Sequence, residues 1–174
     1  STTNFATMSM NTGGTIYFYV VKGGTTYSVA TISGLPLNTW THVATRWTAA
    51  TNSPEVFFNG VQQSTVAGGT SSTGTSGIMS IGTRPGGAQY FGGRLDEIRI
   101  WNTARTQAEI SGTMNSSLPG NTSGIEAYYK FNEGTGTTAA DATPAANTAT
   151  LSGSPVWEVP STAPVSGGCE GTPI

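Results

Sequence analysis

Short stretches of alternating hydrophobic and polar residues, separated by turn residues, run along most of this chain. Alternation with a period of two places successive side chains on opposite faces and is typical of a β-strand. Residues 15–21 are rich in aromatic and β-branched side chains, and a Lys-Gly-Gly turn separates them from a second stretch at 25–31. The further stretches predicted as strands are 40–47, 55–58, 61–64, 78–82, 92–102, 125–131, 148–151 and 156–157.

Two local motifs define how neighbouring segments connect. Asn59-Gly60 predicts a type I′ hairpin turn, because these two residues tolerate the two positive φ angles that this turn demands. Thr106 followed by Glu109 fits a capping box and predicts one short helix near 104–114. Many short strands with a single helix indicate an all-β fold, an antiparallel β-sandwich or jelly roll. A parallel α/β fold is disfavoured because the helical crossovers that it needs are absent from the pattern.

Composition narrows the function classes. One domain is expected for 174 residues. Charged residues make up only 9 %, against roughly 25 % in an average globular protein, so Thr, Ser, Asn and Gly must provide solubility, as is common in secreted and surface proteins. The net charge of -2 and the scattered cations argue against nucleic-acid binding. No apolar run approaches the roughly 20 residues of a membrane span, so no membrane insertion is expected. The lone Cys169, whose role stays open, lies in a Pro/Ser/Gly-rich segment at 159–174 that is predicted to be a linker or tail.

Asp96 is the most informative acidic residue. In a strand over 92–102 it shares its face with Ile98 and Ile100, whereas Arg99 lies on the opposite face with Glu97. A carboxylate among apolar residues must be paired, hydrogen-bonded, bound to a metal or placed at a wet strand end. Because Arg99 points away, a bound cation and a hydrogen bond to the amides of a neighbouring loop are both open interpretations.

An ordered set of motifs carries a resemblance to the laminin G-like, concanavalin A-like jelly-roll family, as found in bacterial secreted and surface proteins. The motifs are Trp-Thr-His-Val-Ala at 40–44, Phe-Phe-Asn-Gly at 57–60, Ile-Gly at 81–82, Phe-Gly-Gly-Arg-Leu-Asp-Glu-Ile-Arg-Ile-Trp-Asn at 91–102, Ala-Arg-Thr-Gln-Ala-Glu-Ile at 104–110, Ala-Tyr-Tyr-Lys-Phe-Asn-Glu-Gly at 127–134, and Asp141. The resemblance implies a laminin G-like sandwich over residues 1–158. Family members have further strands before the segment near residue 15, so this chain is expected to lack its N-terminal strands. A sandwich without them exposes open edges and core. Residues 1–174 alone are therefore expected to be unstable or to aggregate, unless upstream residues or a neighbouring chain supply the strands.

The resemblance also implies a metal. In related glucanases and lectins an aspartate at the start of the matching strand ligates a structural calcium, and Asp96 stands at that position. Asp141 and Glu133 are further candidate ligands, because their loop is expected near a rim of the sandwich. Catalysis is not expected, because the paired glutamates that sandwich glucanases use on one strand are not present, and the acids of this chain are isolated.

Binding is the favoured function class. If the face of residues 15–21 that holds Ile16 and Phe18 is the core, Tyr17 and Tyr19 lie on the open face, where a sugar ring could stack. The alternative is that both tyrosines only cover the sheet. Arg84 and Tyr90 lie in a turn-rich loop that could also meet a ligand.

The chain is therefore predicted to be a non-catalytic, extracellular or cell-surface module that serves adhesion or binds a glycan or surface glycoconjugate. Two alternatives stay open. One is a structural spacer or filament subunit that self-associates by strand addition. The other is an accessory domain of a polysaccharide-degrading enzyme.

Overall fold

The computed structural model describes residues 4–67, 79–83, 89–158 and 161–166. The chain divides into two compact units. The first unit comprises Ser1–Gly93 with Thr106–Ser111, and the second comprises Arg94–Arg105 with Gly112–Ile174. Each unit is described by itself below.

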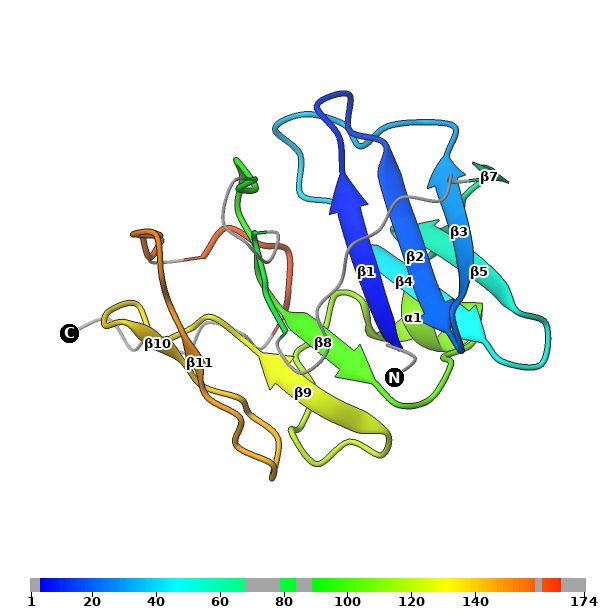
Figure 1. The fold of residues 1–174 in the computed structure, drawn as a ribbon. Coiled ribbons are helices and arrows are strands. Elements are labelled where there is room, and N and C mark those ends of the chain that lie inside the picture. Colours follow the sequence, from blue (N-terminus) through cyan, green and yellow to red (C-terminus); the bar gives the residue numbers. More distant parts are fainter. Residues whose placement is uncertain (1–3, 68–78, 84–88, 159–160, 167–174) are drawn as a thin grey trace. The chain divides into compact units, whose positions relative to one another are not determined.

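The first unit contains two antiparallel sheets (Figure 1). The first sheet has the order β1-β2-β3-β7, and the second has the order β4-β5-β6. The strands are β1 (Phe5–Met10), β2 (Ile16–Lys22), β3 (Thr25–Thr31), β4 (Val43–Thr48), β5 (Ser53–Phe58), β6 (Val61–Gln62) and β7 (Thr65–Ala67). The expected strands at 15–21, 25–31, 40–47 and 55–58 are thus present, whereas the alternation over residues 5–10 was overlooked.

An apolar layer between these two sheets forms the core of the first unit. Ile16, Phe18 and Val20 point from β2 to one side and pack with Val56 of β5, which is fully buried. Each such side chain contributes roughly 1.5–3 kcal/mol on burial. Val29, Leu35, Val43, Trp47 and Phe58 surround this cluster. Of the two faces that the sequence left open, the Ile16 and Phe18 side of β2 is therefore the core. The predicted antiparallel β-sandwich is present.

Both tight hairpins of the first unit depend on residues that accept positive φ angles. Asn59 and Gly60 have φ angles of 48° and 76°, which confirms the predicted type I′ turn. Gly23 and Gly24, with φ angles of 58° and 83°, join β2 to β3 in the same way. These turns fix the register in which Phe18 pairs with Val29 and Phe58 pairs with Val61.

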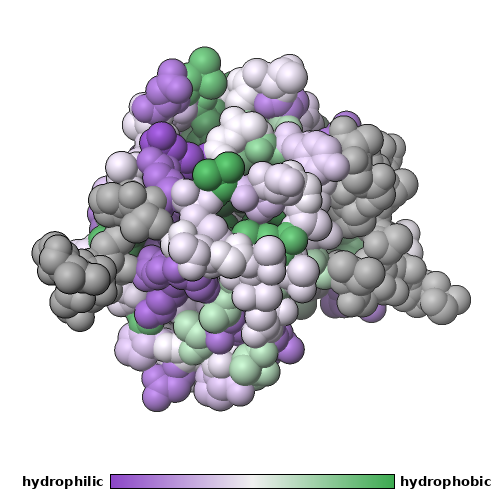
Figure 2. Space-filling model, turned by 90° about the vertical axis from the view of Figure 1, so that its left-hand side faces the viewer, coloured by the Kyte–Doolittle hydropathy of each residue, from purple (hydrophilic) through white to green (hydrophobic). Residues whose placement is uncertain are grey.

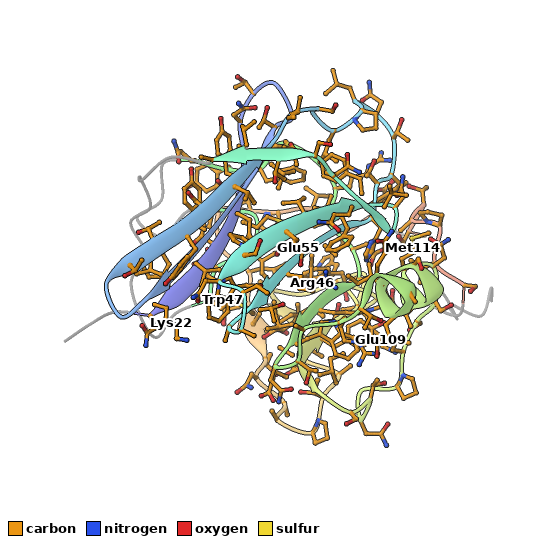
Figure 3. The ribbon with its side chains drawn as sticks, turned by 90° about the vertical axis from the view of Figure 1, so that its right-hand side faces the viewer. Lys22, Arg46, Trp47, Glu55, Glu109 and Met114 are labelled. Atoms are coloured by element: carbon orange, nitrogen blue, oxygen red, sulfur yellow. The ribbon has the colours of Figure 1, made fainter. Side chains whose placement is uncertain are left out.

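The short helix α1 (Gln107–Thr113) confirms the predicted helix and its cap. The Glu109 amide donates a hydrogen bond to Thr106 Oγ1 at 3.2 Å, and the Thr106 amide donates to Glu109 Oε2 at 2.7 Å. Figures 1 and 3 place α1 beside β4 and β5. Ile110, the buried residue of the helix, is 8 % exposed.

The second unit consists of two short antiparallel pairs. β8 (Ile98–Trp101) pairs with β9 (Ile125–Tyr129), and β10 (Thr138–Ala139) pairs with β11 (Ala149–Thr150). The strand predicted over 92–102 was too long, because Glu97 has a φ angle of 54° and interrupts the extended backbone just before β8. No strand forms at 156–157, nor over the described residues of 78–82, and β10 was not anticipated.

The segment beyond residue 158, expected to be a linker or tail, makes hydrogen bonds over its described residues 161–166. Ser166 forms an isolated parallel bridge with Ser116, and the Ser117 amide donates to the Ser166 carbonyl at 3.1 Å. Just before this segment, Glu158 lies 2.8 Å from Arg94 in an exposed ion pair. Glu158 and the described residues 161–166 are therefore attached to other parts of the second unit at several points.

Candidate functional site

Two tyrosines of β2 lie on the side of the first sheet that faces away from its core. Tyr17 and Tyr19 alternate with Ile16, Phe18 and Val20, so their rings leave the sheet in the opposite direction. The ring centroids are 6.2 Å apart and the ring planes differ by only 8°. Tyr17 is half-buried, whereas Tyr19 is 9 % exposed. Burial, followed by the nearby Tyr17 hydroxyl, raises the pKa of Tyr19. Tyr17 is therefore the more accessible ring.

The strands on either side of β2 surround the two rings with short side chains. Tyr19 pairs with Thr7 of β1 and with Ser28 of β3, and Tyr17 pairs with Ser9 and Ala30. Residues in direct cross-strand register share one face of a sheet. We call the surface formed by Thr7, Ser9, Tyr17, Tyr19 and Ser28 the tyrosine face. It combines the two tyrosine rings with the three aliphatic hydroxyl groups of Thr7, Ser9 and Ser28. Of these five side chains Ser9 is exposed, Tyr19 is buried and the others are half-buried.

The turn between β1 and β2 supplies a polar group at one end of the tyrosine face. Asn11 Nδ2 lies 3.5 Å from the Tyr17 hydroxyl, while Asn11 Oδ1 accepts hydrogen bonds from the amides of Gly13 and Thr15 at 3.0 Å each. The side chain of Asn11 is thus held by the backbone of its own turn. Its position next to Tyr17 is set by the hairpin rather than by the tyrosine.

The two other predicted ligand-binding residues belong to a loop. Tyr90 is 69 % exposed and forms an isolated antiparallel bridge with Thr83. Arg84 lies outside the described residues. Tyr90 is thus an exposed aromatic residue on a loop rather than part of the strands that form the tyrosine face, which makes it a separate candidate.

Asp96 accepts two hydrogen bonds. The Glu97 amide donates to its Oδ1 at 2.8 Å, and the Ser161 hydroxyl donates to its Oδ2. Burial raises the pKa of Asp96, and the Glu97 carboxylate adds to this effect, although the two hydrogen bonds act against it. The structure therefore gives Asp96 hydrogen-bond partners without an arginine.

Asp141 is the centre of a loop in the second unit. Its Oδ1 accepts hydrogen bonds from the amides of Tyr128 and Thr143 at 3.0 Å each, and its Oδ2 accepts from the Thr143 hydroxyl at 2.9 Å and the Asn147 amide at 3.1 Å. Burial by itself raises the pKa of Asp141, but these hydrogen bonds outweigh it and hold the pKa below its usual value. N–H and O–H donors rather than oxygen ligands surround this carboxylate. It fastens its loop to β9.

The three predicted metal ligands are not gathered in one place. Glu133 accepts a hydrogen bond from the Ala140 amide at 2.7 Å, so each of the three acids has its own protein donors. Among the residues that the structure describes, no group of three or more His, Cys, Asp or Glu side chains could hold a metal ion. Calcium at Asp96, Asp141 or Glu133 stays a prediction, to be tested by comparing thermal unfolding in calcium and in excess chelator.

A buried polar network in the second unit was missed by the sequence reasoning. Arg99 Nη2 lies 2.7 Å from Glu97 Oε2, and both side chains are 9 % exposed. The Arg99 guanidinium also donates to the carbonyls of Thr113 and Ser116, at 3.0 Å and 2.5 Å. The Tyr128 hydroxyl donates to Glu97 and accepts from the Leu118 amide. The sequence contained one indication of this ion pair, because Glu97 and Arg99 are two residues apart and share one face of the predicted strand.

This network joins β8, β9 and residues 113–118 of the second unit. Burial raises the pKa of Tyr128, and its hydrogen bond to Glu97 raises it further. The members of the network are enclosed and bonded to one another within the unit, although the buried Arg99 Nε has no hydrogen-bond partner. The network therefore connects parts of the fold and offers no open site for a substrate.

The face drawn in Figure 2 shows small hydrophobic patches separated by neutral and hydrophilic residues. Figure 3 shows the labelled charged side chains of the first unit, of which Arg46 and Glu55 form an ion pair at 2.6 Å across β4 and β5. Within the described residues, no helix is long and apolar enough to cross a membrane.

The two packed antiparallel sheets of the first unit define a β-sandwich. The family model of the concanavalin A-like lectin/glucanases superfamily matches residues 1–111, and the chain belongs to this family, as its laminin G-like motifs predicted. No curated protein matches the chain.

One similar solved structure is that of a "putative carbohydrate binding protein" from Bacteroides ovatus ATCC 8483. It shares 24 % sequence identity with this chain, with a TM-score of 0.55. The similarity covers 88 % of this chain but only 50 % of the other, so this chain spans about half the length of that protein. At this level of identity the comparison supports the fold.

Proposed function

We propose that this chain is a non-catalytic carbohydrate-binding module and that the tyrosine face holds the glycan. The observation that carries the proposal is the pair of nearly parallel rings of Tyr17 and Tyr19, 6.2 Å apart on the outer side of β2. Aromatic rings offer a large apolar surface to the C–H face of a sugar at a small entropic cost. Lectin-like members of the family, and a structural neighbour named as carbohydrate binding, support the same class of ligand.

The absence of catalysis is part of the proposal. Hydrolysis of a glycosidic bond needs two carboxyl groups on opposite sides of the bond. Within the described residues of the first unit, the acids are Glu55, which is paired with Arg46, and Glu109, which belongs to the cap of α1. Neither lies on the strands that form the tyrosine face. We therefore expect bound polysaccharide to be released unchanged.

The experiment is a glycan array probed with the wild-type chain and with Tyr17→Ala. Loss of binding in Tyr17→Ala, with unchanged thermal unfolding, would support the tyrosine face. Tyr19→Ala is a weaker test because Tyr19 is largely buried and its loss also affects packing. Tyr90→Ala is the matched control, since it removes an exposed tyrosine from a different segment. If Tyr90→Ala abolishes binding and Tyr17→Ala does not, the site belongs to the loop.

One observation favours a second candidate function, a structural module that self-associates. Among the described strands, β1 pairs with β2 alone, and its core-side residues Met8 and Met10 are 50 % and 42 % exposed. An uncharged edge strand with exposed apolar residues is a template for strand addition. Sedimentation of the wild-type chain and of Met8→Lys separates the two functions. Concentration-dependent association that Met8→Lys abolishes favours assembly, whereas a monomer at all concentrations argues against it.

The extracellular or cell-surface location is likewise proposed. It is supported by the family and by the low share of charged residues, which is 9 %. Surface labelling of cells that express the full gene would test it, and labelling confined to permeabilised cells would contradict it.

A further inference from the structure

We infer that the tyrosine face accepts an uncharged glycan. This inference rests on the proposed function and specifies the chemical class of its ligand. It is carried by the side chains that share the outer face of β1, β2 and β3, and by the places where the cations of the first unit are held.

The cross-strand register assigns nine positions to this outer face. They form three rows: Ser9, Tyr17 and Ala30; Thr7, Tyr19 and Ser28; and Phe5, Val21 and Thr26. Every one of these side chains is uncharged. The polar atoms that they offer are hydroxyls, which both donate and accept hydrogen bonds and so match the hydroxyls of a neutral sugar.

The cations that the structure describes in the first unit are held elsewhere. Within its described residues these are Lys22 and Arg46. Lys22 follows Ile16, Phe18 and Val20 in steps of two along β2, so it belongs to the core side of the strand and not to the tyrosine face. Its ammonium lies 5.1 Å from the centre of the Trp47 ring. Figure 3 shows Lys22 and Trp47 next to each other. Arg46 lies in the other sheet, where its guanidinium is 2.6 Å from Glu55.

An acidic glycan is a poor match for such a surface. Uronic acids, sialic acids and sulfated sugars carry anions whose strong partners are the guanidinium and ammonium groups of Arg and Lys. Binding a carboxylate or sulfate next to uncharged hydroxyls removes water from the anion without supplying an opposite charge. Stacking on Tyr17 together with hydroxyl contacts suits a neutral hexose chain instead.

The test compares soluble polysaccharides of both classes by isothermal titration calorimetry. The neutral probes are a β-glucan, an α-glucan and a galactomannan, and the acidic probes are polygalacturonate and heparin. We expect at least one neutral probe to bind, a loss of tenfold or more in Tyr17→Ala, and the same affinity in 50 mM and 500 mM salt. Lys22→Gln is the matched control and should bind as tightly as the wild type.

The outcomes separate this inference from the proposed function. If an acidic probe alone binds, and does so through Tyr17 with an affinity that falls in high salt, the class is wrong while the proposed function stands. If neutral probes bind but Tyr17→Ala binds them equally well, the tyrosine face is not the site, and both proposals are overturned. If no probe of either class and no glycan of the array binds the folded chain, the proposed function fails as well.

Discussion

The two units of this chain are stabilised in different ways. In the first unit, the buried cluster of Ile16, Phe18, Val20 and Val56 is wholly apolar. In the second unit, the Glu97–Arg99 ion pair and the Asp141 carboxylate are enclosed together with aromatic residues such as the fully buried Tyr128. Apolar burial is non-directional, whereas a buried charge is stable only with all its partners in place.

This difference predicts which kind of substitution destabilises each unit. Loss of volume should damage the first unit at any pH, because its core contains no titrating group. The second unit should respond to loss of a single charge and to acid, because a half-satisfied buried network costs more than an apolar core. Three substitutions test this contrast, beginning with the largest expected effect.

Phe18→Ala should lower the free energy of unfolding by about 4 kcal/mol, because it leaves a cavity between the two sheets of the first unit. Phe18 is 6 % exposed and belongs to the apolar cluster. Urea unfolding at pH 7 and at pH 5 measures the effect, which should be equal at both. Leu37→Ala, at an 82 % exposed position, is the control and should cost little. A loss below about 1 kcal/mol would show that Phe18 does not pack as described.

Arg99→Met should cost about 3 kcal/mol, because it leaves the Glu97 carboxylate buried without its counter-charge. The double variant Glu97→Gln/Arg99→Met should recover part of this loss. Hydrogen exchange of the β8 and β9 amides, measured by mass spectrometry, locates the effect in the second unit. If the single and double variants are equally unstable, charge compensation is not what Arg99 provides.

Asp141→Asn should cost about 2 kcal/mol at neutral pH, since charge-assisted hydrogen bonds to its carboxylate are weakened. The folded pKa of Asp141 lies below the unfolded value, which is about 3.9. Its stabilisation is therefore fully present above that value and is lost as the pH falls through the folded pKa. The difference in unfolding free energy between wild type and variant should shrink in that acid range.

Asp96→Asn is the matched control, because it removes the same charge from the chain's other aspartate. Burial raises the folded pKa of Asp96, so its charged form is disfavoured in the fold, and the pH dependence has the opposite sign. We expect Asp96→Asn to cost less than Asp141→Asn at neutral pH. The reverse order would mean that Asp96 holds a stronger partner, and stabilisation by added calcium would then identify that partner as the metal.

Local sequence patterns determined much of the fold. The positive φ angles that the Asn59-Gly60 turn requires, the reciprocal cap of Thr106 and Glu109, and the period-two alternation around Phe18 all act within a few residues. These patterns therefore predicted the hairpins, the helix and the division of β2 into two faces, and the structure decided which of the two is the core. The family was predicted from the resemblance that the ordered motifs carry, and the family model confirms it.

Only the tertiary structure decided the partners of the acids and the exposure of the tyrosines. Glu97 leaves the extended conformation, so the alternation that seemed to place Asp96 among apolar side chains does not hold there. Ser161 lies 65 residues from Asp96, and Asn147 contacts Asp141 through the fold of its loop. The sequence predicted that Tyr19 shares one face of its strand with Tyr17, but it did not predict that only 9 % of Tyr19 is exposed. Burial and hydrogen bonding depend on residues far apart in the chain, which no local period encodes.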